Sequence, residues 1–417
     1  IRYRLRSRGL GDVYKRQVDV RVISNKERVN SVRVRPLSYK ITPDCVGDTV
    51  TFSLSRPRNL SVEVNGDIFH NLHLFANPID KFRPSDKEIQ RALKKKKGSN
   101  LIYFGPGVHN LPNDTLFVPS GTTVYIDGGA RVYGNIFTEG AHDVNIFGRG
   151  EVHPDGRGAG VWVRRSKNVR IDGIVVSQLP IGQCDSVELT NVKSISYYGW
   201  GDGMDVFSSS NVILDGVFCR NSDDCAAVYA STQGFKGGSN NVLVKNATLW
   251  ADVAHPINIG GHGDPNGMDT VQNVTFRNID ILDQAEKQID YQGCLAINPG
   301  DNTLVRNITF ENIRIEDFRN GQLVNFRISF NPKYCVSTGR GIQNVLVKDV
   351  TYNGSGENLS IIAGYDENHK ISGIRFVNLV VNGRKITDDM PGKPKWYKTG
   401  DMAGIFVGEH VENLSFE

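Results

Sequence analysis

A short motif that returns along the chain constrains the fold more than any other feature. It reads Asn-Val-x-apolar, usually followed within two residues by Asn, Asp or Gly, and it begins at Asn168, Asn191, Asn211, Asn241, Asn273, Asn307 and Asn344. The intervals between these copies are 23, 20, 30, 32, 34 and 37 residues. A constant strand core joined by spacers of variable length indicates a solenoid whose extra residues leave as loops on one face.

Within each copy, apolar and polar positions alternate, as expected for a strand with one buried face. The Asn that opens each copy can then stack on its counterparts as a ladder of hydrogen bonds. The repeat lacks the leucine spacing of leucine-rich repeats and the four strands per unit of a propeller. The sequence therefore predicts an all-β fold, a right-handed parallel β-helix preceded by a small β-sandwich.

The regions before the repeat differ from it in composition. Residues 18–78 contain short strand-like runs separated by Pro, Asn-Gly and Gly-Asp turns, which favours the β-sandwich. Residues 79–99 are charged and predict a linker with a short helix near 85–97. Residues 1–17 carry six Lys/Arg against one acid and are interpreted as a non-native or disordered leader. The β-helix domain is placed at 100–417, with a truncated C-terminus expected because the sequence stops within a strand-like copy.

Charge and hydropathy exclude some partners. The formal net charge of +4 becomes −1 once the leader, with its net charge of +5, is set aside. The remaining basic run, Lys94 to Lys97, is typical of a solvated loop or helix end. No apolar stretch approaches the roughly 20 residues of a membrane span. We predict neither nucleic-acid binding nor a membrane span. The oligomeric state is left open. The six cysteines form no C-x-x-C pair and are interpreted as buried thiols, with the disulfide state left open.

Acidic residues occur at equivalent points of two consecutive copies. The turn GDGMD contains Asp202, and the turn SDDC contains Asp223 and Asp224. Asp202 and Asp223 are 21 residues apart, close to one coil of a β-helix. Successive coils stack at about 4.7–4.9 Å, so we expect the three carboxylates to form one acidic pocket. Mutually repelling carboxylates are typical of sites where chemistry needs them.

The succession GDGMD, SDDC and a His-containing turn resembles the inverting polysaccharide hydrolases of glycoside hydrolase families 28 (polygalacturonases) and 49 (dextranase and isopullulanase types). The similarity spans roughly residues 115–417, and the phrase LSVEVNGDIFHNLHLFANP resembles the β-sandwich of family 49. The resemblance implies a glycosidase with a polysaccharide substrate, no cofactor, no metal, and a secreted or periplasmic location. Inverting hydrolysis uses an acid and a base about 6.5–9.5 Å apart, with a water between them.

The resemblance also implies a role for each acid. Asp223 would be the general acid, and Asp202 and Asp224 would act as base. Nearby carboxylates would keep Asp223 protonated near neutral pH. The third motif has two candidates, His262 in GGHGD and His255 in AHPINIGG. The coil spacing favours His255, and either one would orient the acid cluster or the substrate.

Other side chains near the acids are candidates for sugar contact, because sugars place C–H faces on aromatic rings. The selected residues are Trp200, Asp205, Trp250, His262, Lys287 and Tyr291. Asp205 is also expected to bond turn amides. A calcium-binding role for the acids, as in lyases of similar fold, is a minor alternative, because the motif turns contain no basic residue to abstract a proton.

The substrate prediction depends on one difference between this sequence and the polygalacturonases. Polygalacturonases carry an Arg-Ile-Lys triplet that pairs with the galacturonate carboxylate, whereas the corresponding turn here reads CLAINPGD. The sequence therefore favours a neutral α-linked glucan such as dextran, with galacturonan as the alternative. Lys287, Arg319 and Arg327 on neighbouring loops offer substitute cations. A non-catalytic carbohydrate-binding β-helix is the further alternative.

Overall fold

The computed structural model describes residues 17–25, 28–94, 98–154 and 156–417. The chain divides into two compact units, with the boundary between Lys81 and Phe82. The predicted leader lies outside the described residues apart from Gln17. The finer limits drawn from the sequence at 78 and 99 stay predictions.

The N-terminal unit is a small antiparallel β-sandwich. One sheet has the order β1 (Val18–Ile23), β4 (Thr49–Leu54), β3 (Asp44–Val46), and the other β2 (Val32–Arg35), β5 (Arg58–Val64), β6 (Leu72–Ala76), with the 3-10 turn η1 (Leu37–Tyr39) between β2 and β3. Alternate residues of both sheets, among them Val20, Phe52 and Leu60, share one core. The turn-rich sequence thus forms the predicted sandwich.

The second unit begins with helix α1 (Asp86–Leu93). Ser85 caps it: the Ser85 side chain accepts a hydrogen bond from the backbone of Glu88, and the Glu88 carboxylate accepts one from the backbone of Ser85. The helix is shorter than the 85–97 predicted, and residues 95–97 are outside the described ranges.

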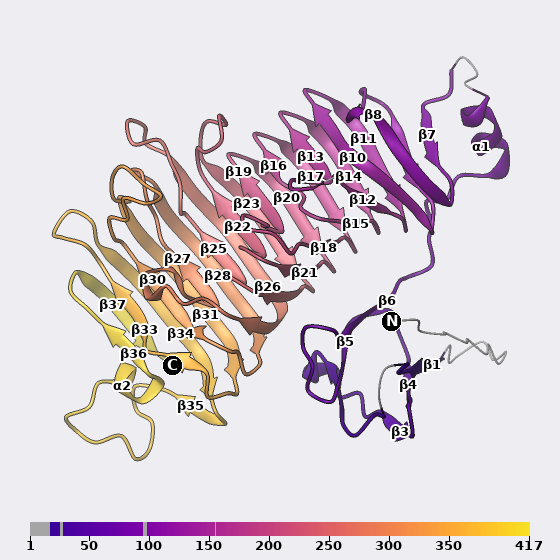
Figure 1. Cartoon of the computed structure of the whole chain (residues 1–417). Helices are drawn as coiled ribbons and strands as arrows, with labels where there is room; N and C mark the ends of the chain where they lie inside the picture. The colour runs from indigo at the N-terminus through magenta and orange to yellow at the C-terminus, as the bar shows by residue number, and fades with distance from the viewer. Residues whose placement is uncertain (1–16, 26–27, 95–97, 155) are drawn as a thin grey trace. The chain divides into compact units, whose positions relative to one another are not determined.

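From β7 to β37 the chain winds into a parallel β-helix of stacked coils (Figure 1). Each coil contributes a strand to three faces. The outer strands of face A are β10 (Ala130–Glu139), β13 (Val161–Arg164), β16 (Ile181–Gly182), β19 (Met204–Phe207), β22 (Ala226–Tyr229), β25 (Ile257–Ile259), β27 (Leu295–Ile297), β30 (Val324–Arg327), β33 (Ser360–Ala363) and β36 (Ile405–Val407). Face A also includes the end of β8 (Gly107–Phe117), which pairs with β10.

Face B carries the recurring motif, and face C is formed by shorter strands. Face B consists of β7 (Leu101–Phe104), β9 (Thr123–Ile126), β11 (His142–Gly148), β14 (Lys167–Asp172), β17 (Asp185–Thr190), β20 (Ser210–Asp215), β23 (Ser239–Lys245), β26 (Thr270–Gln284), β28 (Leu304–Ile315), β31 (Gly341–Tyr352), β34 (Ile371–Val381) and β37 (Val411–Phe416). Face C consists of β12 (Glu151–His153), β15 (Val175–Val176), β18 (Lys193–Ile195), β21 (Phe218–Asn221) and β24 (Thr248–Ala251), and continues in the second halves of the long face B strands.

The remaining elements lie in the connections between faces C and A. They are η2 (Ile289–Tyr291), β29 (Gly321–Gln322), β32 (Glu357–Asn358), β35 (Arg384–Ile386) and α2 (Thr399–Ala403). In the described ranges no helix is both long and apolar enough to cross a membrane. All six cysteines are free, and four are buried as predicted, but Cys45 is exposed and Cys335 half-buried because they lie in an edge strand and a loop.

The core of the β-helix is a set of stacked columns of apolar side chains. In face A, Val206 lies beside Val228, which lies beside Ile259 and then Ile297, and each is at most 1% exposed. The residues between them point outward. Face A therefore presents its alternate residues to the outside in columns that run along the helix axis.

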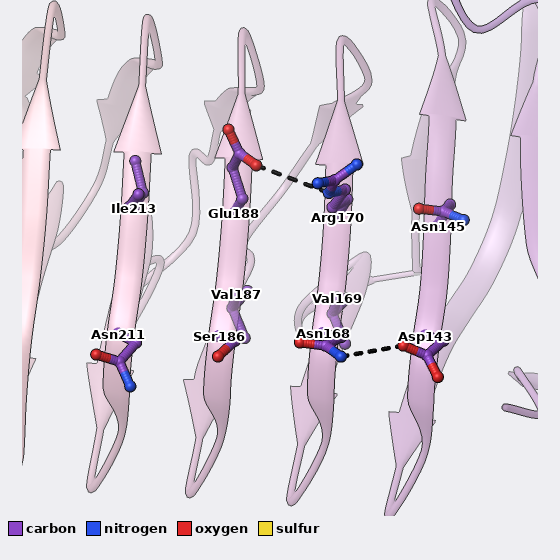
Figure 2. A pocket seen from close by; sticks show the side chains of 10 residues that line it. All are labelled: Asp143, Asn145, Asn168, Val169, Arg170, Ser186, Val187, Glu188, Asn211 and Ile213. Carbon is purple, nitrogen blue, oxygen red and sulfur yellow. Dashed lines mark hydrogen bonds and ion pairs between the residues drawn. The ribbon is translucent and has the colours of Figure 1, made fainter. Parts of the chain in front are cut away.

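The Asn that opens most face B strands forms the predicted ladder. The copy predicted at Asn191 is wrong, because Asn191 follows β17 in the turn into face C and Ser186 holds the equivalent position in β17. Asn211, Asn241, Asn273 and Asn307 all have φ between 55° and 57°, the left-handed conformation that Asn adopts more easily than most residues. Asn241 Nδ2 donates to Asn211 Oδ1 at 2.7 Å, and Asn307 Nδ2 donates to Asn273 Oδ1 at 3.2 Å. Figure 2 shows the start of the ladder, where Asn168 Nδ2 donates to Asp143.

The ladder predicts a graded effect of substitution. Asn241→Ala removes the bond to Asn211 and forces a Cβ-bearing residue without a compensating side chain into the left-handed region, so it should lower the free energy of unfolding by about 1–2 kcal/mol or more. Asn241→Gly keeps the backbone conformation and should be less damaging. Thermal unfolding followed by circular dichroism would measure both. An Ala variant as stable as the Gly variant would contradict this role of the ladder.

Candidate active site

The coil register brings the three predicted acids together. Met204 of β19 pairs with Ala226 of β22, which places Asp202 beside Asp224 in the turns that lead into these strands. The backbone N–H of Gly203 donates to the Asp224 carbonyl at 2.7 Å. One carboxylate oxygen from each of Asp202, Asp223 and Asp224 lies within 4.8 Å of the others. Acids separated in sequence by one coil therefore form one cluster.

Local packing explains the residues around these acids. A Cβ on Gly203 would lie 2.2 Å from the Cys225 carbonyl oxygen, so the closely stacked turns require glycine there. The Asn221 side-chain amide donates to the Ser194 and Ser196 hydroxyls at 3.0 Å each and to the Asp202 carbonyl at 3.1 Å. Asn221 thereby ties the turn that carries Asp202 to the coil that carries Asp223.

Asp224 is the most highly coordinated acid. Its Oδ1 accepts hydrogen bonds from the backbone N–H of His255 at 3.0 Å and from His255 Nδ1 at 2.7 Å. Its Oδ2 accepts from the Tyr229 hydroxyl at 2.5 Å and from Asn258 Nδ2 at 2.8 Å. Burial favours the neutral acid, but attraction to His255 together with the hydrogen bonds from His255, Asn258 and Tyr229 outweighs burial and lowers the pKa of Asp224. Asp224 is therefore held as an anion.

The other two acids have the opposite shift. Burial, followed by the charges of Asp224 and Asp202, raises the pKa of Asp223 to about 8. Burial and the charge of Asp224 raise the pKa of Asp202 to about 7. Near neutral pH the cluster thus contains a carboxyl that keeps its proton beside a carboxylate that has lost its own, the pairing that general acid and base catalysis requires.

The spacing of the acids differs from the expectation. The nearest oxygens of the cluster are at most 4.8 Å apart, closer than the separation of about 6.5–9.5 Å expected between the carboxyl groups of an inverting site. The stacking of adjacent coils explains the short distance, because it places Asp202 directly beside Asp224. The spacing alone therefore does not assign the stereochemistry. The same three oxygens are close enough to share a cation, which is a competing use of the cluster.

The structure distinguishes the two candidate histidines. His255 is fully buried and bonds Asp224, while its Nε2 is buried without a hydrogen-bond partner. His262 lies on the other side of Tyr229, with ring centroids 5.0 Å apart, and burial lowers the pKa of His262. Tyr291 packs edge-on against His255 at 4.3 Å, and its hydroxyl is 3.5 Å from Asp224 Oδ2. His255 is thus the histidine of the acid cluster, as the coil spacing favoured.

The remaining predicted contact residues are not all at the surface. Trp200, in the turn before Asp202, is 66% exposed, and Lys287 is exposed in the loop after β26. Trp250 is fully buried, because the guanidinium of Arg220 on the preceding coil lies 4.1 Å from its ring centroid. The prediction that Trp250 contacts sugar is therefore wrong.

Asp205 differs from its predicted structural role. Its Oδ1 is buried without a hydrogen-bond partner, so it does not bond turn amides through that oxygen. Burial, followed by the charges of Asp202, Asp224 and Asp223, raises the pKa of Asp205. Asp205 is on the outward column of face A, one residue beyond Met204, which points into the core.

Two functional side chains were missed by sequence reasoning. Tyr229 and Asn258 both bond Asp224 Oδ2, and Asn258 Nδ2 also donates to the Tyr229 hydroxyl at 3.1 Å. Both follow the acid or histidine turn by a few residues, on outward positions of β22 and β25. In the sequence, the alternation of apolar and polar residues in these two strands could have indicated that both side chains point outward, toward the acids.

A second concavity lies on the outer surface of face B (Figure 2). Its lining includes Arg170 and Glu188, whose charged groups are 3.8 Å apart and largely exposed. It is separate from the acid turns, which join face C to face A. Since its acids and bases are exposed and paired, we place the chemistry at the acid cluster instead.

The cluster predicts a dependence of stability on pH. The pKa of Asp223 in the folded chain is about 8, above an unfolded value of about 3.9, so the folded state holds the extra proton between these values and loses stability as pH rises through them. Asp223→Asn should therefore raise the melting temperature relative to wild type more at about pH 8.5 than at about pH 4.5. Differential scanning fluorimetry measures this, with the exposed Asp44→Asn as control. An offset that does not vary with pH would contradict the shift.

Comparison with known proteins agrees with this architecture. A polygalacturonase of Juniperus ashei is 26% identical over 295 residues, which cover 63% of this chain and 54% of the relative. An exopolygalacturonase of Cochliobolus carbonum is 24% identical over 246 residues, covering 51% of this chain and 52% of the relative. The chain thus spans about half the length of these curated relatives.

Solved structures show the same fold at low identity. The family 28 exopolygalacturonase of Yersinia enterocolitica has a TM-score of 0.55 and 12% identity, covering 99% of this chain and 98% of that one. Dex49A from Penicillium minioluteum has a TM-score of 0.64 and 15% identity, covering 96% and 82%. The model of the glycosyl hydrolases of family 28 matches residues 161–390, more than half of the chain and all of the acid cluster. The chain belongs to the glycosyl hydrolases of family 28.

Proposed function

We propose that the chain hydrolyses glycosidic bonds of a galacturonic-acid-containing polysaccharide. The main support for the proposal is the difference in pKa within the acid cluster. The pKa of Asp223 is raised to about 8, so it keeps its proton, and the pKa of Asp224 is lowered, so it is ionised. The polygalacturonase names of the relatives support the substrate class. The alternative of a silent binding module is less favoured, because all three acids are present and converge. A secreted or periplasmic location remains a prediction.

In the proposed mechanism, Asp223 donates its proton to the glycosidic oxygen as the bond to the anomeric carbon breaks. Asp224, assisted by Asp202, accepts a proton from the water that attacks that carbon from the opposite side, so that the configuration inverts. His255 is a positioning residue: it pairs with Asp224 Oδ1, while Tyr229 and Asn258 hold Oδ2. These bonds fix the carboxylate in one orientation and keep it ionised, so that it is free to accept a proton.

The preference for a neutral glucan is not carried forward. It relied on the missing cations of the segment Cys294–Asp301, whose outward side chains on face A are Ala296 and Asn298. The relatives favour galacturonan, the alternative drawn from the sequence. Dex49A shares the fold, but at 15% identity this similarity says nothing about the substrate of the chain. A galacturonan substrate requires cations elsewhere in the site.

Two cations beyond that segment meet this requirement. Lys333 Nζ lies 4.7 Å from the ring centroid of Tyr334, which stacks on Tyr291 at 5.1 Å. A hydrogen bond with Tyr334 raises the pKa of Lys333, and the negative charge of Asp223 acts in the same direction. Lys333 is exposed, and its Nζ donates to the neutral side chain of Gln288 at 3.1 Å, so its positive charge is available to a uronate.

Arg327 is the second cation. It follows Asn298 in the outward column of face A, and its Nη1 lies 2.6 Å from Asp290 Oδ1. Its side chain is 30% exposed. Arg319, by contrast, is held by Asp283 and Asp252 at 2.5 and 2.7 Å. We therefore propose Lys333 and Arg327, rather than Arg319, as partners of substrate carboxylates, and Lys287 stays a prediction.

The central test is product release. The chain should liberate reducing ends from polygalacturonate but not from dextran or pullulan, and Asp223→Asn should lower kcat by about a hundredfold or more, because the leaving oxygen loses its acid. Proton NMR of the first product should show the inverted anomer, and EDTA should leave the rate unchanged. Release from dextran alone, or loss of activity with EDTA, would contradict the proposal.

The cation assignment has its own test. Lys333→Gln and Arg327→Gln should each raise KM for polygalacturonate several-fold, since an exposed charge-assisted hydrogen bond contributes about 1 kcal/mol. The effect should shrink on methyl-esterified pectin, which lacks the charge. Lys348→Gln, which removes a lysine paired with Glu311 on face B, is the matched control. Equal KM values for all four proteins would argue against carboxylate recognition by these residues.

A further inference from the structure

An aromatic column leads away from the acids on the outer surface of face A. Phe117 of β8, Phe137 of β10 and Trp162 of β13 are in register on successive coils. The Phe117 and Phe137 rings stack at 5.4 Å, and the Phe137 and Trp162 rings at 6.4 Å. They point outward because their neighbours Ile136 and Val161 fill the core. Phe117 is 63% exposed, and the other two rings are half-buried.

The column is continuous in register with the active site. Val163 pairs with Ile181 and Ile181 with Val206, so the position of Trp162 continues through Pro180 to Asp205. Two coil steps of about 4.8 Å separate Trp162 from Asp205, a span of about 10 Å along the axis. A sugar chain lying along face A would therefore reach Trp162 within a few residues of the cleaved bond.

A cluster of buried aromatic side chains lies between the column and the acids. Phe235 packs over Gly182, where an added Cβ would lie 2.3 Å from the Phe235 ring. Phe235 stacks on Phe207 at 6.1 Å, and Phe207 stacks on Tyr229 at 5.8 Å. Trp162 packs against this cluster, and the Tyr229 hydroxyl bonds Asp224. Phe207, Phe235 and Tyr229 are at most 5% exposed, so this buried cluster supports Trp162 from below and links its packing to the acid cluster.

A cation borders the column. The guanidinium carbon of Arg164 is 5.8 Å from the ring centroids of both Phe137 and Trp162, and Arg164 Nε lies 2.9 Å from Glu139. Aromatic surface offers contact to the C–H faces of sugars, and a bordering arginine suits a sugar that bears a carboxylate. One exposed ring and two half-buried rings stacked in a row, about 10 Å from Asp205 at their near end, form an apolar patch of the kind that marks binding sites.

We propose that Phe117, Phe137 and Trp162 form distal subsites for the polysaccharide chain, on the N-terminal side of the acids. The occupant is the acidic polysaccharide of the proposed function, on which this inference rests, and the argument for it is the continuity of the column with the acid cluster. Each ring adds contact only when the sugar chain is long enough to reach it. The subsites therefore make affinity depend on chain length and leave the chemical step unchanged.

The first experiment compares substrates of different length. Trp162→Ala and Phe137→Ala should raise KM for polygalacturonate about five- to tenfold, in keeping with about 1 kcal/mol for each lost ring contact, with kcat unchanged. On the shortest oligogalacturonide that is cleaved, both variants should match wild type. Trp162→Phe should restore most of the affinity. Trp396→Ala, which removes a tryptophan 83% exposed in the loop before α2, is the matched control.

A second variant tests the same proposal without disturbing the core of the β-helix. Phe117 is 63% exposed, so Phe117→Ala removes a ring without opening the core, and Phe69→Ala, 65% exposed in the N-terminal unit, is its control. The inactive Asp223→Asn protein, with and without Phe117→Ala and Trp162→Ala, is titrated with polygalacturonate, dextran and pullulan by calorimetry. Polygalacturonate should bind more weakly, about fivefold, when either ring is removed.

The outcomes separate the two proposals. Weaker binding of dextran or pullulan in the ring variants, with no binding of polygalacturonate, would keep the distal subsites and overturn the proposed substrate. Cleavage and binding of polygalacturonate with no effect of either ring would overturn the subsites and keep the function. If none of the three polysaccharides bound the intact protein, both proposals would fall.

Discussion

The parallel register between adjacent coils is the constraint on which the rest of the structure depends. Each strand pairs with the equivalent strand of the next coil, so a residue and its counterpart about one coil later lie side by side. The same pairing stacks valines in the core, asparagines along face B and acids at the corner between faces C and A. A change in register by one residue would turn Asp205 inward and Met204 outward, and would dismantle the site.

The site uses this register to place carboxylates closer than their charges favour. Asp224 is stabilised as an anion by donors from three positions, His255, Asn258 and Tyr229. Burial, together with the charge of this anion, raises the pKa of Asp223 to about 8 and that of Asp202 to about 7. The cluster costs folding stability, because three acids share a partly desolvated corner, and it brings together a carboxyl and a carboxylate of different pKa, as the proposed acid and base require.

Substrate recognition in our interpretation follows the columns of face A. On the C-terminal side of the acids the outward column ends in polar and cationic groups, with Arg327 and the nearby Lys333. On the N-terminal side the parallel outward column that contains Asp205 becomes aromatic, with Trp162, Phe137 and Phe117. A polysaccharide with carboxylates on its edges and C–H groups on its faces matches both characters. Because successive coils stack along one axis, both groups of residues can contact one extended chain.

The sequence by itself determined the fold and the grouping of the three acids. The recurring Asn-Val motif carries the strand period and the ladder residue, and the acids recur at the coil interval, so both are local patterns that stacking converts directly into structure. Only the tertiary structure decided that His255 rather than His262 bonds Asp224, that Arg220 covers Trp250, and that Tyr229 and Asn258 complete the site. These contacts join different coils through spacers of unequal length. Their geometry depends on how each loop folds back on the stack, which no local pattern encodes.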